Sequence, residues 1–146
     1  MNDFVLPRSL LIALGVQVCC QGFKFVSHSI RLRHLSWKHL MTFGGMPSSH
    51  SAFVTALAVC IGIFEGFATN LFGLAAVFGA IVIFDAYRLR GNVQKQAVVV
   101  NRLQGQLLPV DQRIVIEEMV GHTLPEIIAG IALALALAVP VALWLE

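Results

Sequence analysis

Residues 44–52, GGMPSSHSA, place polar side chains directly ahead of an apolar run and are the first candidates for chemistry. If Ser48 caps a helix, the free N–H groups of its first turn, the positive helix end and the hydroxyls of Ser48 and Ser49 converge on one spot. That spot favours an anion, and His50 would be placed to protonate the group that leaves it. A structural interpretation is equally open, because serine is a good cap and Gly-Gly is a flexible entry.

A second polar helix start follows at residues 121–126, GHTLPE. Thr123 and Glu126 have the spacing of a capping box, and Pro125 is tolerated in a first turn, so Glu126 has a sound structural role. His122 and Glu126 are also four residues apart, which would let the carboxylate fix the tautomer of the imidazole. A histidine held in this way can attack phosphorus.

The elements that must hold these residues are apolar. The chain is 58% hydrophobic with a mean hydropathy of +0.81, which favours a single all-α, membrane-embedded domain over residues 1–146. The two middle apolar runs are short against the ~20 residues that a spanning helix needs, so a buried hairpin is their alternative. We expect about four spans: Leu6–Val26, Ala52–Phe67, Leu71–Tyr87 and Leu124–Leu145.

Two long connections join these spans. Residues 31–43, RLRHLSWKHLMTF, have leucine and phenylalanine on one side and basic residues on much of the rest, which is typical of a helix lying in the headgroup layer. An ordinary solvated connector is the alternative. From Arg88 to Gly121, apolar residues recur at near-helical spacing until Pro109, which predicts two short helices over the membrane surface.

The charges are strongly segregated by this arrangement. Four spans place both termini on one side, and of the ten Lys and Arg residues only Arg8 lies there. By the positive-inside rule the opposite face is cytoplasmic, and it also carries all five histidines. Its basic residues are Lys24, Arg31, Arg33, Lys38, Arg88, Arg90, Lys95, Arg102 and Arg113.

Together these motifs resemble a known family. PSSHS followed by GHTLPEIIAG is similar to the second and third motifs of the type 2 phosphatidic acid phosphatase superfamily, which includes vanadium haloperoxidases and bacterial acid phosphatases. GGMPSSHSA, FDAYRLR and EEMVGHTLPEIIAG jointly resemble its divergent membrane branch, and this resemblance covers nearly the whole chain. Either histidine motif alone is a weak signal, whereas the joint match is specific.

The resemblance implies a role for each matching residue. His122 would be the nucleophile that forms a phosphohistidine, Glu126 its orienting partner where the wider family usually has aspartate, and His50 the acid that protonates the leaving oxygen. Ser48 and the backbone around Ser49 would hold phosphate oxygens, although Ser49 stands where the wider family has glycine.

The first motif and its arginines depart from the family pattern. Lys24 corresponds to the motif lysine, but the Arg-Pro that usually follows it is absent, and Ile116 stands where an arginine is expected six residues before His122. Phosphoryl transfer needs cations around the equatorial oxygens. We expect Arg90 to substitute, with Arg88 behind it.

Asp85 and Glu118 are the acidic residues without an assigned role. Carboxylates beside a phosphate oppose its binding unless they orient cations or hold a metal such as Mg²⁺. We favour salt bridges to Lys24 or Arg90 over a Mg²⁺ site, and we expect no cofactor.

The predicted function is a phosphatase of the cell (inner) membrane that acts at the cytoplasmic face on a lipid phosphate or amphiphilic phosphate ester. The alternatives are a phosphotransferase between lipid head groups and a non-catalytic anion-binding scaffold. We expect no nucleic-acid partner. Close-approach faces predict a homo-oligomer; they are formed by Gly62, Gly66, Gly73 and Gly79.

Overall fold

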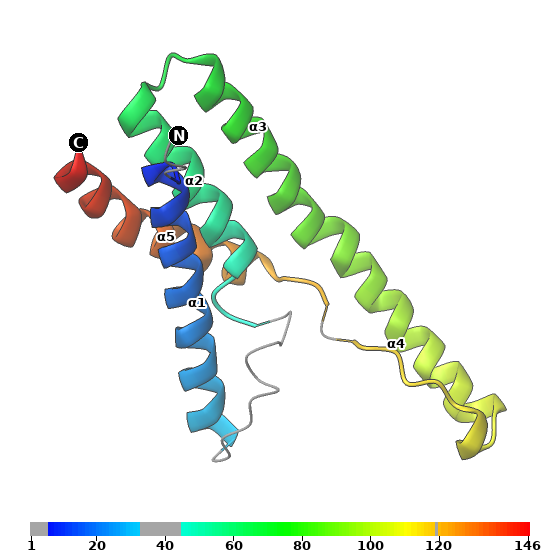
Figure 1. The fold of residues 1–146 in the computed structure, drawn as a ribbon. Coiled ribbons are helices and arrows are strands. Elements are labelled where there is room, and N and C mark those ends of the chain that lie inside the picture. Colours follow the sequence, from blue (N-terminus) through cyan, green and yellow to red (C-terminus); the bar gives the residue numbers. More distant parts are fainter. Residues whose placement is uncertain (1–5, 33–44, 119) are drawn as a thin grey trace, which may run out of the picture.

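The computed structural model describes residues 6–32, 45–118 and 120–146, and within these ranges the regular secondary structure is all helical, with no strand (Figure 1). The all-α prediction is therefore confirmed. The basic segment at 31–43, predicted to lie in the headgroup layer, falls outside the described residues from position 33 onward. The main helices are α1 (Arg8–Leu32), α2 (Ser49–Glu65), α3 (Asn70–Phe84), α4 (Arg90–Leu107) and α5 (Leu124–Leu145).

Three of these helical stretches are long and apolar enough to cross a membrane: Arg8–Ser27, Asn70–Leu107 and Leu124–Leu145. The fourth, α2, has 17 residues and so extends for about 25 Å, slightly less than a bilayer core of about 30 Å. The bounds of α5 match the predicted span, and α1 continues beyond the predicted end at Val26. The chain is thus a helical membrane bundle.

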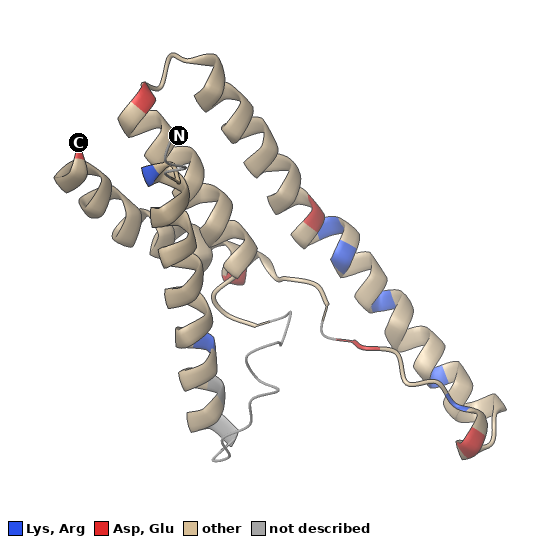
Figure 2. Ribbon diagram, viewed as in Figure 1, with Lys and Arg blue, Asp and Glu red and all other residues tan. Residues whose placement is uncertain are grey.

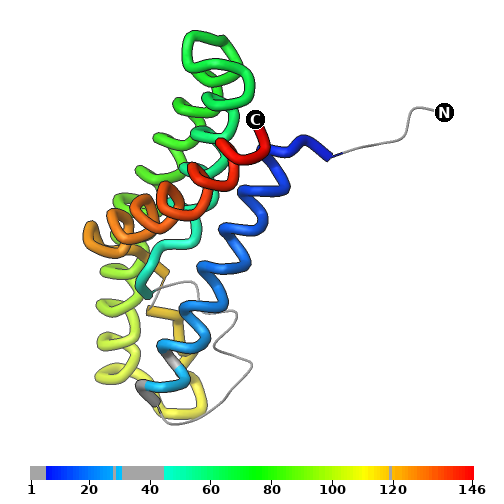
Figure 3. Tube along the Cα trace, turned by 90° about the vertical axis from the view of Figure 1, so that its left-hand side faces the viewer, coloured from blue at the N-terminus to red at the C-terminus, as the bar shows by residue number. Residues whose placement is uncertain are grey.

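Helix α2 is the centre of the bundle and packs against α1, α3 and α5. Its neighbours approach closely because the buried positions carry small side chains at helical spacing, the arrangement that helices use to associate in lipid. Helix α5 crosses α2 obliquely (Figure 3). The core residues are Ala13, Val16 and Cys20 of α1, Ala52, Ala56 and Cys60 of α2, and Ala134, Ala138 and Ala142 of α5.

The start of α1 and the end of α5 lie at one end of the bundle, as four spans require. The guanidinium of Arg8 donates a hydrogen bond to the carbonyl of Leu145 at 2.9 Å. The other Lys and Arg residues that the structure describes lie on the lower part of α1, along α4 and on the segment that follows it (Figure 2). The predicted charge segregation is therefore present in the fold.

The connection after α3 differs from its prediction. In place of two short surface helices, a π-helical turn at Asp85–Leu89 joins α3 to α4, and the three form one helix over Asn70–Leu107. The prediction was wrong because no proline interrupts this stretch, and single glycines such as Gly91 cost only about 1 kcal/mol in a helix. The predicted break at Pro109 is correct, and only a 3₁₀ turn, Val110–Gln112, follows it.

Residues 108–118 run back along α4 towards the bundle (Figure 1). Asn101 fixes this return path, since its amide nitrogen donates to the Ile116 carbonyl at 2.8 Å and its oxygen accepts from the Ile116 N–H at 3.0 Å. Arg113 adds hydrogen bonds to the carbonyls of Leu108 and Gly105. The return path delivers residues 121–123 to the junction of α2, α4 and α5.

The glycines behind the homo-oligomer prediction are mostly used within the chain. Gly62 lies against the Phe67 ring, Gly66 ends α2 with a φ of +99°, and Gly79 of α3 contacts Val54 of α2. Only Gly73 has open space beside it. The homo-oligomer stays a prediction, and of the four glycines on which it was based only Gly73 still supports it.

Candidate active site

Ser48 caps α2, as predicted. Its oxygen accepts from the Ser51 N–H at 3.4 Å and from the Ser51 hydroxyl at 2.9 Å, and the side chain is fully buried. Both bonds hold the first turn of α2 in place. The cap therefore uses the Ser48 oxygen as the acceptor of two hydrogen bonds.

Lys24 of α1 reaches the same helix start. Its Nζ donates to the Ser49 Oγ at 3.5 Å, and both residues are buried. One turn earlier on α1, the Cys20 thiol contacts the Pro47 carbonyl at 3.6 Å. The predicted lysine of the first motif thus lies beside the serines of the second motif.

The backbone of His122 is attached to the long helix at its π-helical turn. The His122 N–H donates to the Ala86 carbonyl at 3.1 Å, and the Gly121 N–H donates to the Gln94 side chain at 3.3 Å. A Cβ on Gly121 would lie 2.9 Å from the Gly91 backbone, so only glycine permits this approach. Single π turns often occur at functional sites, and here the turn positions a candidate catalytic residue.

Glu126 serves both as a cap and as the partner of His122. Its Oε2 accepts from the Thr123 N–H at 3.1 Å and lies 3.0 Å from Nδ1 of His122. An ionised carboxylate only accepts hydrogen bonds, so Nδ1 carries the proton and Nε2 has a free lone pair. Nε2 is buried without a protein partner. The two roles weighed for Glu126 are therefore both present.

The surroundings of His122 favour its neutral form. Burial lowers the pKa of His122, the hydrogen bond to Glu126 partly opposes that shift, and the charges of Lys24 and Arg90 reinforce it. A neutral imidazole with an available Nε2 is the form that can act as a nucleophile.

His50 lies next to His122, with ring centroids 5.9 Å apart and ring planes tilted by 60°. Two backbone contacts bring the starts of α2 and α5 together. The Ser48 N–H donates to the Glu126 carbonyl at 2.9 Å, and Gly130 lies directly against the Ser48 carbonyl. Nδ1 of His50 is also buried without a partner. Both imidazoles thus have a nitrogen available to a ligand.

Arg90 approaches this pair from the long helix. Its Nε donates to Asp85 Oδ2 at 2.9 Å, which realises one of the two predicted salt bridges for Asp85. The charges of Arg90 and Lys24 act on both imidazole rings. Two cations from different helices therefore flank the histidines.

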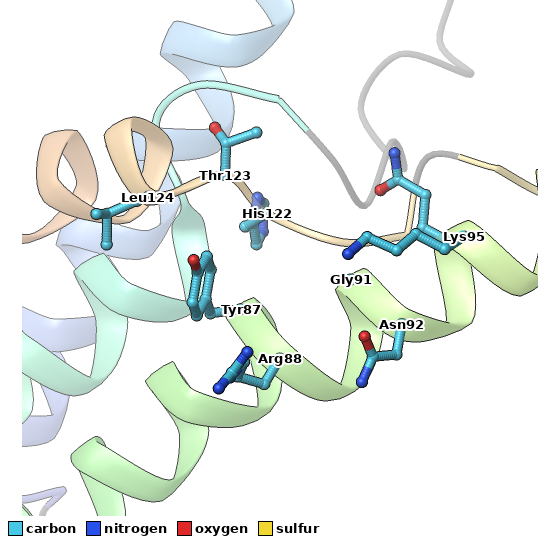
Figure 4. Close-up of a pocket in the computed structure, with 9 residues that line it drawn as sticks. Tyr87, Arg88, Gly91, Asn92, Lys95, His122, Thr123 and Leu124 are labelled. Atoms are coloured by element: carbon cyan, nitrogen blue, oxygen red, sulfur yellow. The ribbon is translucent and has the colours of Figure 1, made fainter.

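A pocket of about 390 Å³ lies between His122 and α4 (Figure 4). His122 and Thr123 form one wall, while the other is formed by α4 and the π-helical turn. The side chains on that wall include Tyr87, Arg88, Asn92 and Lys95.

In the comparison with known families, residues 6–137 of the chain match the family described as "Divergent PAP2 family". The chain belongs to the divergent PAP2 family. It is also similar to "Uncharacterized membrane protein YuiD" of Bacillus subtilis (strain 168), with 39% identity over 94 residues. That match covers 64% of this chain and 60% of the relative, so the chain spans less than two thirds of its length. No solved structure matches the chain significantly.

Membership of the divergent PAP2 family agrees with the grouping of motif residues in space. The structure brings Lys24, Ser48, Ser49, His50, Arg90, His122 and Glu126 to one junction, with Asp85 beside Arg90. Arg88, in the π-helical turn before α4, lines the pocket.

Glu118 lies elsewhere. Its Oε1 accepts from the Asn101 amide at 2.8 Å, and Asn101 is about 16 Å along the helix axis from Arg90. Among the described residues, no group of three or more His, Cys, Asp or Glu side chains is placed to hold a metal.

The sequence interpretation of this PAP2 chain missed four pocket residues: Tyr87, Asn92, Gln94 and Lys95. They recur at helical spacing with Arg88 and Gly91, so they share a face only if the helix continues beyond Tyr87. The predicted span ended at Tyr87 and a separate connection began at Arg88, so this shared face was not recognised.

Proposed function

We propose that this divergent PAP2 protein is a membrane phosphatase that hydrolyses a lipid phosphate or an amphiphilic phosphate ester through a phosphohistidine. One observation carries the proposal. Nε2 of His122 is buried without a partner while Nδ1 is held by Glu126 at 3.0 Å, so the nucleophilic nitrogen is oriented and available.

The reaction proceeds in two steps. In the first, Nε2 of His122 attacks phosphorus, an N–P bond forms, and the bond to the ester oxygen breaks while His50 gives that oxygen a proton. In the second, His50 takes a proton from water, which attacks the phosphohistidine and releases inorganic phosphate. Lys24 and Arg90 stabilise the negative equatorial oxygens in both steps.

An apolar pocket beside the motif residues supports an amphiphilic substrate. It measures about 180 Å³ and includes Phe23, Pro47 and Ala129 in its lining. Phe23 precedes Lys24, Pro47 precedes Ser48, and Ala129 lies one turn after Glu126. In this proposal the hydrocarbon tail of the substrate occupies the apolar pocket.

Release of inorganic phosphate by the purified protein from a panel of lipid phosphates tests this function. His122→Ala should abolish release, and Gln106→Ala, an exposed change on α4, should not. Product analysis with an added alcohol separates hydrolysis from phosphotransfer. Binding of phosphate by a protein that releases none from any substrate would instead favour the scaffold alternative.

The orientation of the site is part of the proposal, and it rests on the charge segregation and the positive-inside rule. Val115 is 88% exposed on the return path. A Val115→Cys substitution in a Cys19→Ser background suits labelling, since Cys20 and Cys60 are buried. An impermeant thiol reagent should label it in inverted membrane vesicles. Labelling in intact cells would reverse the assignment.

A further inference from the structure

The wall of the His122 pocket formed by α4 and the π-helical turn before it carries two cations and no acid. Arg88 and Lys95 both line it, with Asn92 between them, and its lining contains no Asp or Glu. Residues seven apart on a helix lie two turns apart on one face, so the two charges bracket about 10 Å of the pocket. This wall favours a ligand with negative charge.

Neither cation has an acidic partner among the residues that the structure describes. Among the described residues, the ion pairs are Arg90–Asp85 and His122–Glu126, so Arg88 and Lys95 have no acidic partner. Figure 4 shows the Lys95 amine extending along α4 towards Gly91 and the His122 side of the pocket. Unpaired cations in a concave site are available to bind a ligand.

His122 supplies an independent observation in the same pocket. It is 4% exposed, it lines the wall opposite α4, and its Nε2 lacks a partner. Lys24 and Ser49, which we assign to the transferred phosphoryl group, are absent from this pocket's lining. The histidine therefore lies between two polar regions.

We propose that Arg88, Asn92 and Lys95 form an anion subsite for a second negatively charged group of the substrate, adjacent to the phosphoryl group that His122 attacks. The inference rests on the proposed phosphatase function and specifies its substrate class. The enzyme prefers phosphates that carry a neighbouring phosphate or carboxylate over simple monophosphate esters of neutral alcohols.

The chemistry balances for a diphosphate ester. Nε2 of His122 forms the N–P bond to the terminal phosphorus, and the bridging P–O bond breaks with its electron pair on the inner phosphate. That group leaves as a phosphate monoester whose added negative charge faces Lys95 and Arg88. Water then hydrolyses the phosphohistidine, so one diphosphate and one water give a monophosphate ester and inorganic phosphate.

The test compares two substrates with the same hydrocarbon tail, one a diphosphate and the other a monophosphate. Wild-type protein should show the higher kcat/KM for the diphosphate, and Lys95→Gln should lower the diphosphate-to-monophosphate ratio by about 10- to 100-fold, the value of a hydrogen bond to a charged group. Arg102→Gln, which removes a cation of α4 outside the pocket, should keep the ratio. An equal loss for both substrates in Lys95→Gln, or none, would overturn the subsite.

Binding measurements separate this inference from the phosphatase function. By calorimetry, pyrophosphate should bind more tightly than orthophosphate, and Lys95→Gln should remove the difference even if no substrate is hydrolysed. Phosphonoacetate reports whether a carboxylate suffices as the second anion. Equal affinities for pyrophosphate, phosphonoacetate and orthophosphate in the wild-type protein would refute the subsite, whatever the activity.

Discussion

Nδ1 of His122 lies 3.0 Å from Oε2 of Glu126, and that same oxygen caps the helix that begins one residue after Thr123. One carboxylate thus couples the start of a membrane helix to the orientation of the proposed nucleophile. Its position depends on hydrogen bonds that span only four residues, and so it is built into the local sequence.

Replacement of Glu126 separates its two roles. Glutamine can still form a capping box, so Glu126→Gln should fold, but it removes the negative charge that stabilises the protonated Nδ1. We expect kcat to fall by about 10²-fold, in the range of acid–base contributions. Glu65→Gln, at the far end of α2, is the matched control. Equal turnover of Glu126→Gln and wild type would show that the carboxylate only caps the helix.

The pH dependence follows from the lowered pKa of His122. Attack needs the neutral imidazole, and burial keeps it neutral to lower pH, so the acid limb of kcat/KM should lie below the ordinary histidine value of about 6.5. Glu126 raises this pKa, so Glu126→Gln should move the limb to still lower pH. A pH–rate profile measures both shifts, and a limb that moves upward in the variant would contradict the assignment.

Arg90 should not tolerate lysine. Its Nε is occupied by Asp85 at 2.9 Å, which leaves the two terminal nitrogens as a planar fork for phosphate oxygens. A lysine cannot provide both contacts, so Arg90→Lys should lower kcat/KM by about 10- to 100-fold. Arg102→Lys serves as the control. Wild-type kinetics for Arg90→Lys would remove Arg90 from the site.

The contact between α5 and α2 should be intolerant of even a methyl group. A Cβ on Gly130 would meet the Ser48 carbonyl, which is backbone and cannot move aside cheaply. Gly130→Ala should lower the free energy of unfolding by about 1–3 kcal/mol. Gly105→Ala, where the space is open, should be neutral or slightly stabilising. Thermal unfolding in detergent compares the two, and equal midpoints would contradict this packing.

Metal removal should have little effect on activity. Asp85 is engaged by Arg90 and Glu118 by Asn101, so these carboxylates are explained without a metal. Vanadate should inhibit, because as a five-coordinate species it mimics phosphorus under attack by His122. Assays in EDTA and with vanadate check both statements. Activity lost in EDTA and restored by Mg²⁺ would make the carboxylates metal ligands.

The features that could be predicted from sequence depend on short-range spacing. The Ser48 cap and the Thr123–Glu126 capping box are set within four residues, and both are confirmed. The Asp85–Arg90 pair lies on one helix, which also makes it accessible to sequence reasoning. Resemblance to the family supplied what spacing alone could not, namely that Lys24 of α1 belongs with this group.

The features that were missed depend on tertiary structure. Lys95 enters the site only because α3 continues into α4 and residues 108–118 return alongside it. The same return path places Glu118 beside Asn101, away from the histidines. The positions of Lys95 and Glu118 cannot be read from local periodicity, because both depend on the path of a connection of more than ten residues.

The central claim is that His122 carries the phosphoryl group, and rapid-quench trapping with a radiolabelled substrate tests it most directly. The account predicts an acid-labile, base-stable label on the wild-type chain that maps to His122 and is absent from His122→Ala. A His122→Ala protein that still turns over the substrate, or a label on another residue, would contradict the account.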